Sequence, residues 1–221
     1  MKGKTQALAT SAVMIALATA LSLICAVIPF LNLPFGGGFT IAAMLPIVIV
    51  SYIYGTWWGL GTALAYSLIQ LALGAFTGGG YVISLFTVGD DNFMGIGAGI
   101  AIVLIDYIIA YTLLGFGGVF RNCKNKTVGL VAGTAFALSL RYLAHIISGT
   151  VFFGVWAEWF FSQEGFYSIG ASILNTFSGT GLYIVYSIFY NGLYMIPEII
   201  ITSLVAAIIS RIPQIKTVDL K

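Results

Sequence analysis

The chain has 221 residues, of which 60% are hydrophobic and only 7% charged, and its formal net charge is +2. Soluble proteins carry roughly 25% charged residues, so this composition cannot cover a water-facing surface and excludes a soluble domain. The small net charge gives no reason to expect a nucleic-acid partner. Cys25 and Cys123 offer no metal-ligand spacing, so neither a metal site nor a disulfide framework is predicted.

Six apolar segments are predicted to cross the bilayer as helices: residues 6–28, 40–55, 58–75, 95–119, 128–154 and 181–210. A hydrocarbon core of ~30 Å needs about 20 residues of helix, so the second and third segments are the weakest candidates. The first segment also has features of a signal peptide, but its length favours a span. We expect one all-α integral membrane domain over residues 1–221, solvated by the lipid bilayer.

The charges predict the orientation of these helices, because cytoplasmic loops collect lysine and arginine. If the segments alternate, one end of the bundle receives Lys2, Lys4, Arg121, Lys124, Lys126, Arg211, Lys216 and Lys221. The other end receives Asp90, Asp91, Glu158 and Glu164. Both termini are therefore predicted to be cytoplasmic, in a multi-pass protein of the plasma membrane.

Four ionisable side chains other than tyrosine lie within the predicted spans: Asp106, Arg141, His145 and Glu198. At the centre of a membrane helix an Arg or Asp costs about 2.5–3.5 kcal/mol, and such groups usually mark a function. With a rise of ~1.5 Å per residue, three of them lie about 20 Å from the cytoplasmic charges on three different helices. His145 follows Arg141 by one helical turn, so all four are expected near one level of the bundle.

Two roles are open for each of these groups. Arg141 and Glu198 either form a buried structural pair, which we favour, or bind a ligand. His145 either bonds a backbone carbonyl or contacts a ligand, which we favour. If Arg141 pairs with Glu198, Asp106 is left to attract a cation, so a small cationic ligand is predicted.

Two helix faces show residues repeated every four positions. In segment 128–154 this face consists of Gly129, Gly133, Ala137, Arg141, His145 and Gly149. Small residues at this spacing let helices approach closely, so Arg141 and His145 are expected to face protein. In segment 181–210 the corresponding face holds Tyr186, Tyr190, Tyr194 and Glu198, either for packing or for lining a site.

Aromatic residues are concentrated in two outer loops. In loop 29–39, Phe35 lies among glycines and is a candidate lid residue. In loop 152–161, Phe153 and Trp156 are candidate walls, because aromatic faces suit a flat heterocycle or a cation. We expect the next three aromatic residues, Trp159, Phe160 and Phe161, to form part of an interfacial belt.

Two long motifs carry a resemblance to a known family. Residues 141–154 read RYLAHIISGTVFFG, and residues 186–198 read YSIFYNGLYMIPE. They resemble patterns of the substrate-binding S-components of energy-coupling-factor (ECF) vitamin transporters, specifically of the thiamine-specific ThiT type. Weaker similarity extends through most of the six segments.

The resemblance implies the residues of a binding site. Position by position, it implies that His145, Tyr186 and Asn191 contact thiamine and that Asp106 and Tyr107 face it. Phe153 occupies a position where some members have a ring-stacking tryptophan. Asp106 is shorter than the glutamate of some members, and segment 77–96 looks longer than usual, so the pocket is expected to differ in detail.

The resemblance also implies partners. An ECF transmembrane subunit is expected to dock on Ala12, Ala16 and Ala20, whereas spacing alone indicates only a close-packing face, with packing inside the monomer as the alternative. Two ATPase subunits would use ATP, and this chain would bind no cofactor of its own.

The resulting prediction is a non-enzymatic subunit that captures thiamine, or a close cationic analogue, from outside a bacterial cell. Asp106 is expected to balance the thiazolium charge, because an unpaired buried charge is costly. The alternatives are an S-component for another vitamin precursor or cationic heterocycle, an intramembrane enzyme with Asp106, His145 and Glu198 as acid–base groups, and a channel, which the lack of a charged ring disfavours.

Overall fold

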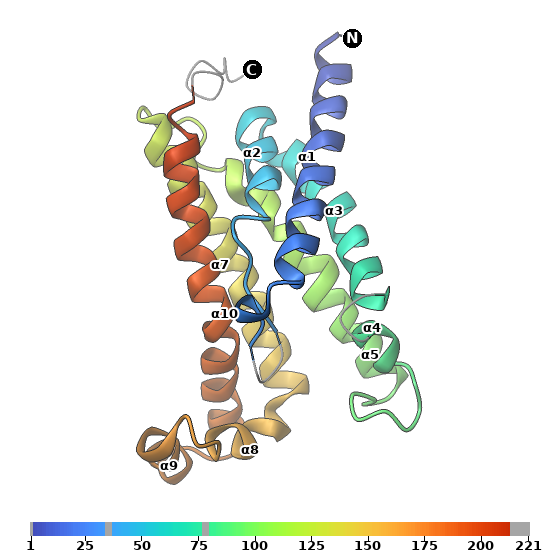
Figure 1. The fold of residues 1–221 in the computed structure, drawn as a ribbon, viewed down its shortest axis with the longest axis vertical. Coiled ribbons are helices and arrows are strands. Elements are labelled where there is room, and N and C mark those ends of the chain that lie inside the picture. The colour runs from blue at the N-terminus through green and yellow to red at the C-terminus, as the bar shows by residue number, and fades with distance from the viewer. Residues whose placement is uncertain (1, 34–36, 77–79, 213–221) are drawn as a thin grey trace.

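A computed structural model describes residues 2–33, 37–76 and 80–212, and these residues form a bundle of helices without a β-strand (Figure 1). The helices are α1 (Lys2–Ala26), α2 (Leu45–Tyr54), α3 (Thr56–Phe76), α4 (Tyr81–Ser84), α5 (Ile96–Ile102), α6 (Ala110–Thr112), α7 (Lys126–Phe152), α8 (Ala157–Phe161), α9 (Tyr167–Thr176) and α10 (Gly179–Ile209). Three 3₁₀ turns cover Pro29–Leu31, Leu113–Gly118 and Gly154–Trp156. A π-helical segment over Val103–Ile109 joins α5 to α6. The all-α prediction is confirmed.

Five helical stretches of the described chain are long and apolar enough to cross a membrane. They are Gly3–Ala26, Thr56–Phe76, Ile96–Gly118, Lys126–Phe152 and Gly179–Ile209. The predicted segment 40–55 forms only the ten-residue helix α2, which is ~15 Å long and about half of a bilayer core. This helix has Pro46 in its first turn, where proline is tolerated, and the residues before it are not helical. The length of α2 therefore does not confirm six full spans.

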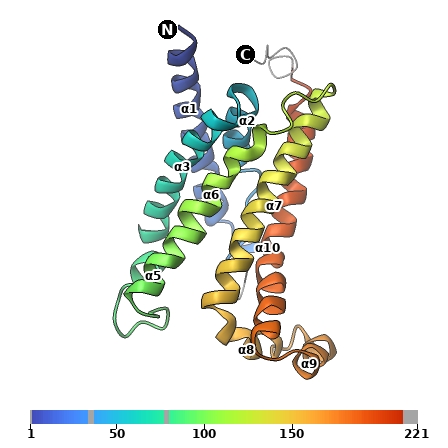
Figure 2. The same ribbon diagram turned by 180° about the vertical axis from the view of Figure 1, so that it is seen from behind.

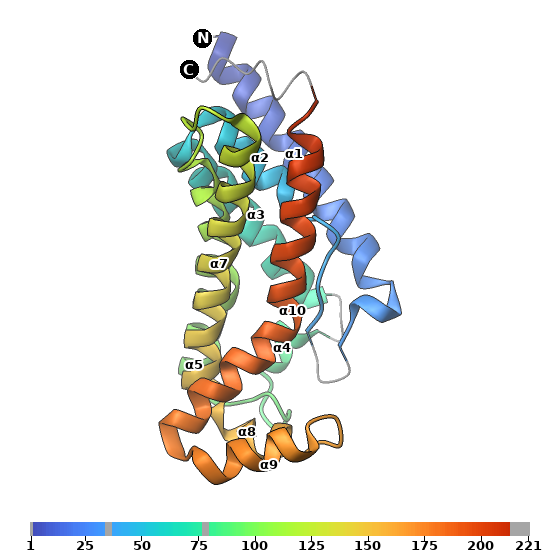
Figure 3. The ribbon, with the colours of Figure 1, turned by 90° about the vertical axis from the view of Figure 1, so that its left-hand side faces the viewer.

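The chain runs back and forth between two ends of the bundle (Figures 1 and 2). The start of α1, the turn between α2 and α3, the start of α7 and the end of α10 lie at one end. Helices α8 and α9 lie at the other end, beneath α7 and α10 (Figure 3). The predicted basic and acidic loops thus lie at opposite ends, within the described residues. Which end faces the cytoplasm stays a prediction, and Lys216 and Lys221 lie outside the described residues.

Helix α7 packs through its small-residue face. All six positions of that face, from Gly129 to Gly149, are buried. An added Cβ at Gly133 would meet the carbonyl oxygen of Gly117, and one at Gly149 would meet the Oγ of Ser187 on α10. Backbones can approach this closely only because no side chain intervenes. The face therefore points into protein, as predicted, and it carries Arg141 and His145 to the centre of the bundle.

We expect Gly133→Ala to destabilise the protein, because its Cβ would collide with backbone that cannot move aside. Overpacking of this kind costs about 1–3 kcal/mol, measurable as a lower midpoint of thermal unfolding in detergent. The control is Gly97→Ala on α5, where nothing lies within 4 Å of the added Cβ. An equal effect of both substitutions would contradict close packing at Gly133.

Candidate ligand-binding site

A cavity of about 540 Å³ opens between the π-helical segment, α7 and α10, toward the end of the bundle that carries α8. Small-molecule sites usually measure about 300–1,000 Å³. The six residues predicted to contact substrate all line it: Asp106, Tyr107, His145, Phe153, Tyr186 and Asn191. Arg141, Tyr190 and Tyr194 line it as well. The tertiary structure thus brings the predicted residues together, although no ligand is present to test their roles.

The cavity also has walls that the sequence patterns did not identify. Tyr81 and Asn92 reach it from the connection between α3 and α5, and Tyr111 reaches it from α6. Tyr111 follows Tyr107 by four residues, a spacing that could have revealed it. Tyr81 and Asn92 belong to a segment without periodicity, so nothing in the sequence marks them. The described part of the segment that looked long, residues 80–96, therefore contributes directly to the cavity.

The π-helical segment positions the acidic residue of the site. It contains Asp106 and Tyr107 and leads into α6 with Tyr111. A π-helical turn is wider than an α-helical turn, and such turns are frequent at functional sites. The adjacent residues Asp106 and Tyr107 both line the cavity, and the rings of Tyr107 and Tyr111 have centroids 6.4 Å apart. Hydrophobic spacing could not predict this local widening.

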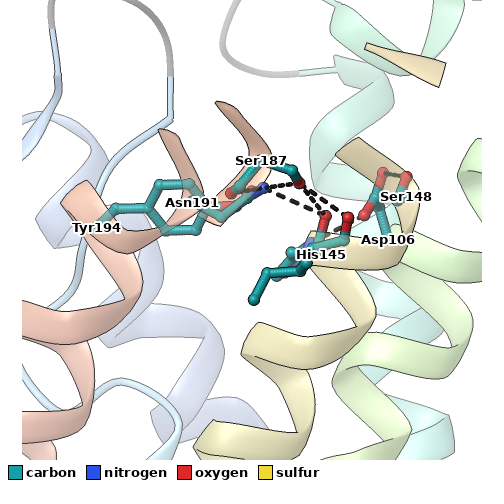
Figure 4. Close-up of polar contacts among 7 residues, drawn as sticks. Asp106, His145, Ser148, Ser187, Asn191 and Tyr194 are labelled. Atoms are coloured by element: carbon teal, nitrogen blue, oxygen red, sulfur yellow. Dashed lines mark hydrogen bonds and ion pairs between the residues drawn. The ribbon is translucent and has the colours of Figure 1, made fainter. Parts of the chain in front are cut away.

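Asp106 is held by two side chains of α7 (Figure 4). His145 Nδ1 lies 2.8 Å from Oδ1 of Asp106, and the Ser148 hydroxyl donates to Oδ2 at 2.6 Å. The expectation that Asp106 has only a ligand cation to attract is therefore wrong. Ser148 was not predicted, although it lies three residues after His145 and so on the same helix face.

Arg141 and Glu198 do not form the direct ion pair that we favoured. The guanidinium carbon of Arg141 lies 4.3 Å from the ring centroid of Tyr111, and Nη1 donates to the sulfur of Met44 at 2.9 Å. Glu198 is 1% exposed and instead accepts hydrogen bonds from residues 37–44 and from α10. Its donors are the Thr40 amide at 2.5 Å, the Thr40 hydroxyl at 2.8 Å and the Thr202 hydroxyl at 3.1 Å. Thr40 thus binds the carboxylate that was expected to pair with Arg141.

Residues 37–44, the described stretch directly before α2, cover one side of the cavity. Gly37 and Gly38 line the cavity, and a Cβ at Gly37 would lie 3.2 Å from the ring of Tyr194. The bonds from Thr40 to Glu198 fix this stretch against α10, and it runs beside α10 in Figures 1 and 3. Phe35, the predicted lid residue, lies outside the described residues.

Asn191 connects α10 to α7. Its Nδ2 donates to the His145 carbonyl at 3.2 Å and to the Ser187 carbonyl at 2.9 Å, and its Oδ1 accepts from the Tyr194 hydroxyl at 2.5 Å (Figure 4). The polar atoms of Asn191 are thus engaged by protein in this structure. A ligand that bonds Asn191 can use the second lone pair of Oδ1 or replace the hydrogen bond from Tyr194.

The aromatic loop after α7 folds inward. Phe160 and Phe161 are buried, and Phe160 has its ring centroid 5.3 Å from that of Tyr186 and 5.7 Å from that of Tyr190. Our expectation that they form an interfacial belt is wrong, because α8 turns back onto α10 and buries them. Trp159 is half-exposed and lines the cavity. The ring of Phe160 thus packs against that of Tyr186 and helps to fix its position.

The alanine stripe of α1 does not pack within the chain. Ala12, Ala16 and Ala20 are all exposed, whereas Ala7, Ser11 and Ala18 on another face of the helix are buried. Packing inside the monomer is therefore not the reason for the stripe. The bundle leaves a flat, small-residue surface on the outside of α1.

We expect Gly74→Ala to disturb the cavity without removing any polar group. A Cβ at Gly74 on α3 would lie 2.8 Å from the ring of Tyr107, so this ring would have to move into the cavity. Ligand affinity should fall roughly tenfold or more, since about 1.4 kcal/mol corresponds to a factor of ten. Quenching of tryptophan fluorescence by added ligand measures this effect.

The matched control is Gly61→Ala on the same helix, where nothing lies within 4 Å of the added Cβ. Its ligand affinity should equal that of the wild type. If both substitutions leave the affinity unchanged, Tyr107 does not shape the binding site.

Comparisons with known proteins point to one family. The sequence pattern of the thiamine transporter protein family (Thia_YuaJ) matches residues 8–170, which include Asp106 and His145 but not α10. The thiamine transporter ThiT of Bacillus subtilis (strain 168) is 30% identical over 207 residues, covering 88% of this chain and 87% of its own length. A solved structure of ThiT from Listeria monocytogenes superposes with a TM-score of 0.58 at 20% identity, covering 97% of this chain and 96% of its own. The structural likeness supports the fold.

Proposed function

Because the chain belongs to the thiamine transporter protein family, we propose that it captures thiamine in the cavity lined by Asp106 and His145. The observation that carries this proposal is the position of Asp106, a carboxylate inside an aromatic cavity of a plasma-membrane protein with several spans. A transporter family implies a non-enzymatic role, in which the cavity holds the ligand without changing it.

The cavity suits a flat cation. Asp106 balances the thiazolium charge, which lowers the cost of burying a cation away from water. The rings of Tyr107, Phe153 and Tyr186 pack against the ligand, and aromatic faces attract cations. His145 and Asn191 supply hydrogen bonds, Asn191 through its Oδ1 atom.

If transport is driven by ATP, partner subunits must use it, because the described residues form only membrane helices and their connections. We infer that an ECF transmembrane subunit docks on the exposed alanine stripe, Ala12, Ala16 and Ala20, and that two ATPase subunits complete the transporter. Small residues allow another helix to approach α1 closely. In this assembly the chain binds thiamine and no cofactor of its own.

We expect Asp106→Asn to weaken thiamine binding far more than it lowers stability. Removing one partner of a buried charge pair costs about 2–5 kcal/mol of binding free energy, so the affinity should fall by roughly 30-fold or more. Titration calorimetry measures the affinity, and thermal unfolding without ligand measures stability.

The matched control is Asp91→Asn, which removes one exposed negative charge from the connection before α5. Thiamine should bind this variant as tightly as the wild type. Equal losses of binding and stability in Asp106→Asn would assign the carboxylate a structural role and remove the support for thiamine capture.

We expect Ala16→Phe to prevent assembly with the ECF subunits while leaving thiamine binding intact. The added ring would hold the partner helix away from the flat surface of α1. Co-purification with the transmembrane and ATPase subunits measures assembly. Leu204→Phe, at an exposed apolar position on α10, is the control and should assemble normally. Normal assembly of Ala16→Phe would exclude this face as the docking surface.

A further inference from the structure

We propose that Ser148 is a positioning residue that acts through Asp106 to present the Nε2 atom of His145 as a hydrogen-bond acceptor to an N–H or O–H group of the ligand. The identity of that ligand rests on the proposed function. The geometry that leads to the proposal is independent of it.

Ser148 and His145 hold the two oxygens of one carboxylate. The Ser148 hydroxyl donates to Oδ2 of Asp106 at 2.6 Å, and His145 Nδ1 lies 2.8 Å from Oδ1. Both donors lie on the same face of α7 and reach across to the π-helical segment (Figure 4). With both oxygens held, the carboxylate cannot turn about its Cβ–Cγ bond without breaking a hydrogen bond. Ser148 is 1% exposed, so its hydroxyl cannot exchange this bond for one to bulk water.

This arrangement decides which nitrogen of His145 carries the proton. A carboxylate only accepts hydrogen bonds, so the nitrogen that faces it, Nδ1, is the donor. The guanidinium of Arg141 lies one turn earlier on the same helix face, and a second positive charge nearby is unfavourable. The Asp106 carboxylate acts in the opposite sense, and burial in the bundle favours the neutral ring. In the proposed arrangement His145 is neutral, so Nε2 has a free lone pair.

The Nε2 atom has no hydrogen-bond partner among the described residues. It is buried, and His145 is 8% exposed and lines the cavity. The ring cannot swing away from the cavity, because Asp106 holds Nδ1 and Tyr194 lies edge-on at a centroid distance of 6.0 Å. The backbone is fixed too, since Asn191 donates to the His145 carbonyl at 3.2 Å.

A fixed acceptor selects ligands by their donors. A site built to bond an N–H or O–H group rejects an analogue that lacks it, because the buried acceptor is then left unpaired. Thiamine has two such donors, the amino group of its pyrimidine ring and its hydroxyl group. Ser148 thus contributes to selectivity without touching the ligand.

The protonation of the imidazole can be read directly, because the chain contains one histidine. The full-length protein is labelled with the heavy nitrogen isotope in histidine and purified in detergent through a tag without histidine. Nuclear magnetic resonance then reports both ring nitrogens of His145 alone. We expect a protonated Nδ1 and an unprotonated Nε2 in the wild type. In Ser148→Ala the carboxylate has lost one of the two hydrogen bonds that fix it and can rotate away from Nδ1. Without that acceptor, a fraction of His145 protonated at Nε2 should appear.

The control is Thr134→Val, which removes a buried hydroxyl from the same helix. That hydroxyl donates to the Leu130 carbonyl at 2.8 Å, some 21 Å along α7 from Ser148. Its spectrum should equal that of the wild type. A wild-type proton on Nε2, or an unchanged tautomer in Ser148→Ala, overturns the proposal.

A binding measurement separates this proposal from the proposed function. Thiamine is compared with one analogue in which hydrogen replaces the amino group and another in which hydrogen replaces the hydroxyl. We expect the wild type and Thr134→Val to bind one analogue about tenfold or more weakly than thiamine, and Ser148→Ala to lose this preference. Equal binding of all three ligands to the wild type contradicts the proposal and leaves thiamine capture intact. If thiamine does not bind at all, the proposed function fails and the tautomer measurement alone decides.

Discussion

The site depends on the bond between a carboxylate and one face of a neighbouring helix, deep within a bundle that lipid surrounds. An ionised group in this setting is stable only when protein groups take the place of water. Ser148 and His145 do this for Asp106, and they can reach it because the small residues of α7 bring the helices close. The glycine positions are thus as necessary to the site as the polar residues.

The same requirement applies to Glu198, another ionisable group buried in the bundle. Glu198 accepts hydrogen bonds from the backbone amide and the hydroxyl of Thr40. The carboxylate thus provides an acceptor for a backbone amide that lies outside regular secondary structure. Backbone that is not helical is tolerated at membrane depth only where protein surrounds it or it lines a cavity. Residues 37–44 meet both conditions, since Thr40 is hydrogen-bonded to Glu198 of α10 and Gly37 and Gly38 line the cavity. Arg141 instead lies over the ring of Tyr111 and lines the cavity.

The outside of the bundle has a different role from its centre. Most exposed large side chains are apolar, as a protein solvated by lipid requires. The exposed alanine stripe of α1 differs from these large apolar side chains. Its small residues make little contact with lipid and let another helix approach closely. The proposed capture of the ligand and the proposed docking of a partner therefore use different surfaces, an internal cavity and the outer face of α1, so each can be altered separately.

The sequence alone determined the features that follow from solvent and spacing. Its apolar composition required lipid, its charges sorted the loops to two ends, and the four-residue spacing on α7 placed Arg141 and His145 inside the bundle. The family resemblance also identified six residues that line one cavity, and four of them lie in the two motifs. These features could be predicted because each depends on the local pattern of the chain or on its transfer from water to lipid.

Only the tertiary structure decided which polar groups meet. That Asp106 bonds Ser148, that Glu198 bonds Thr40 and not Arg141, and that Phe160 turns inward all depend on contacts between segments far apart in the chain. The wider π-helical turn at Asp106 and the short helix α2 likewise have no periodic signature. The reason is physical: several partners are available to each buried polar group, and the choice among them is made by distances of a few tenths of an ångström in the packed bundle.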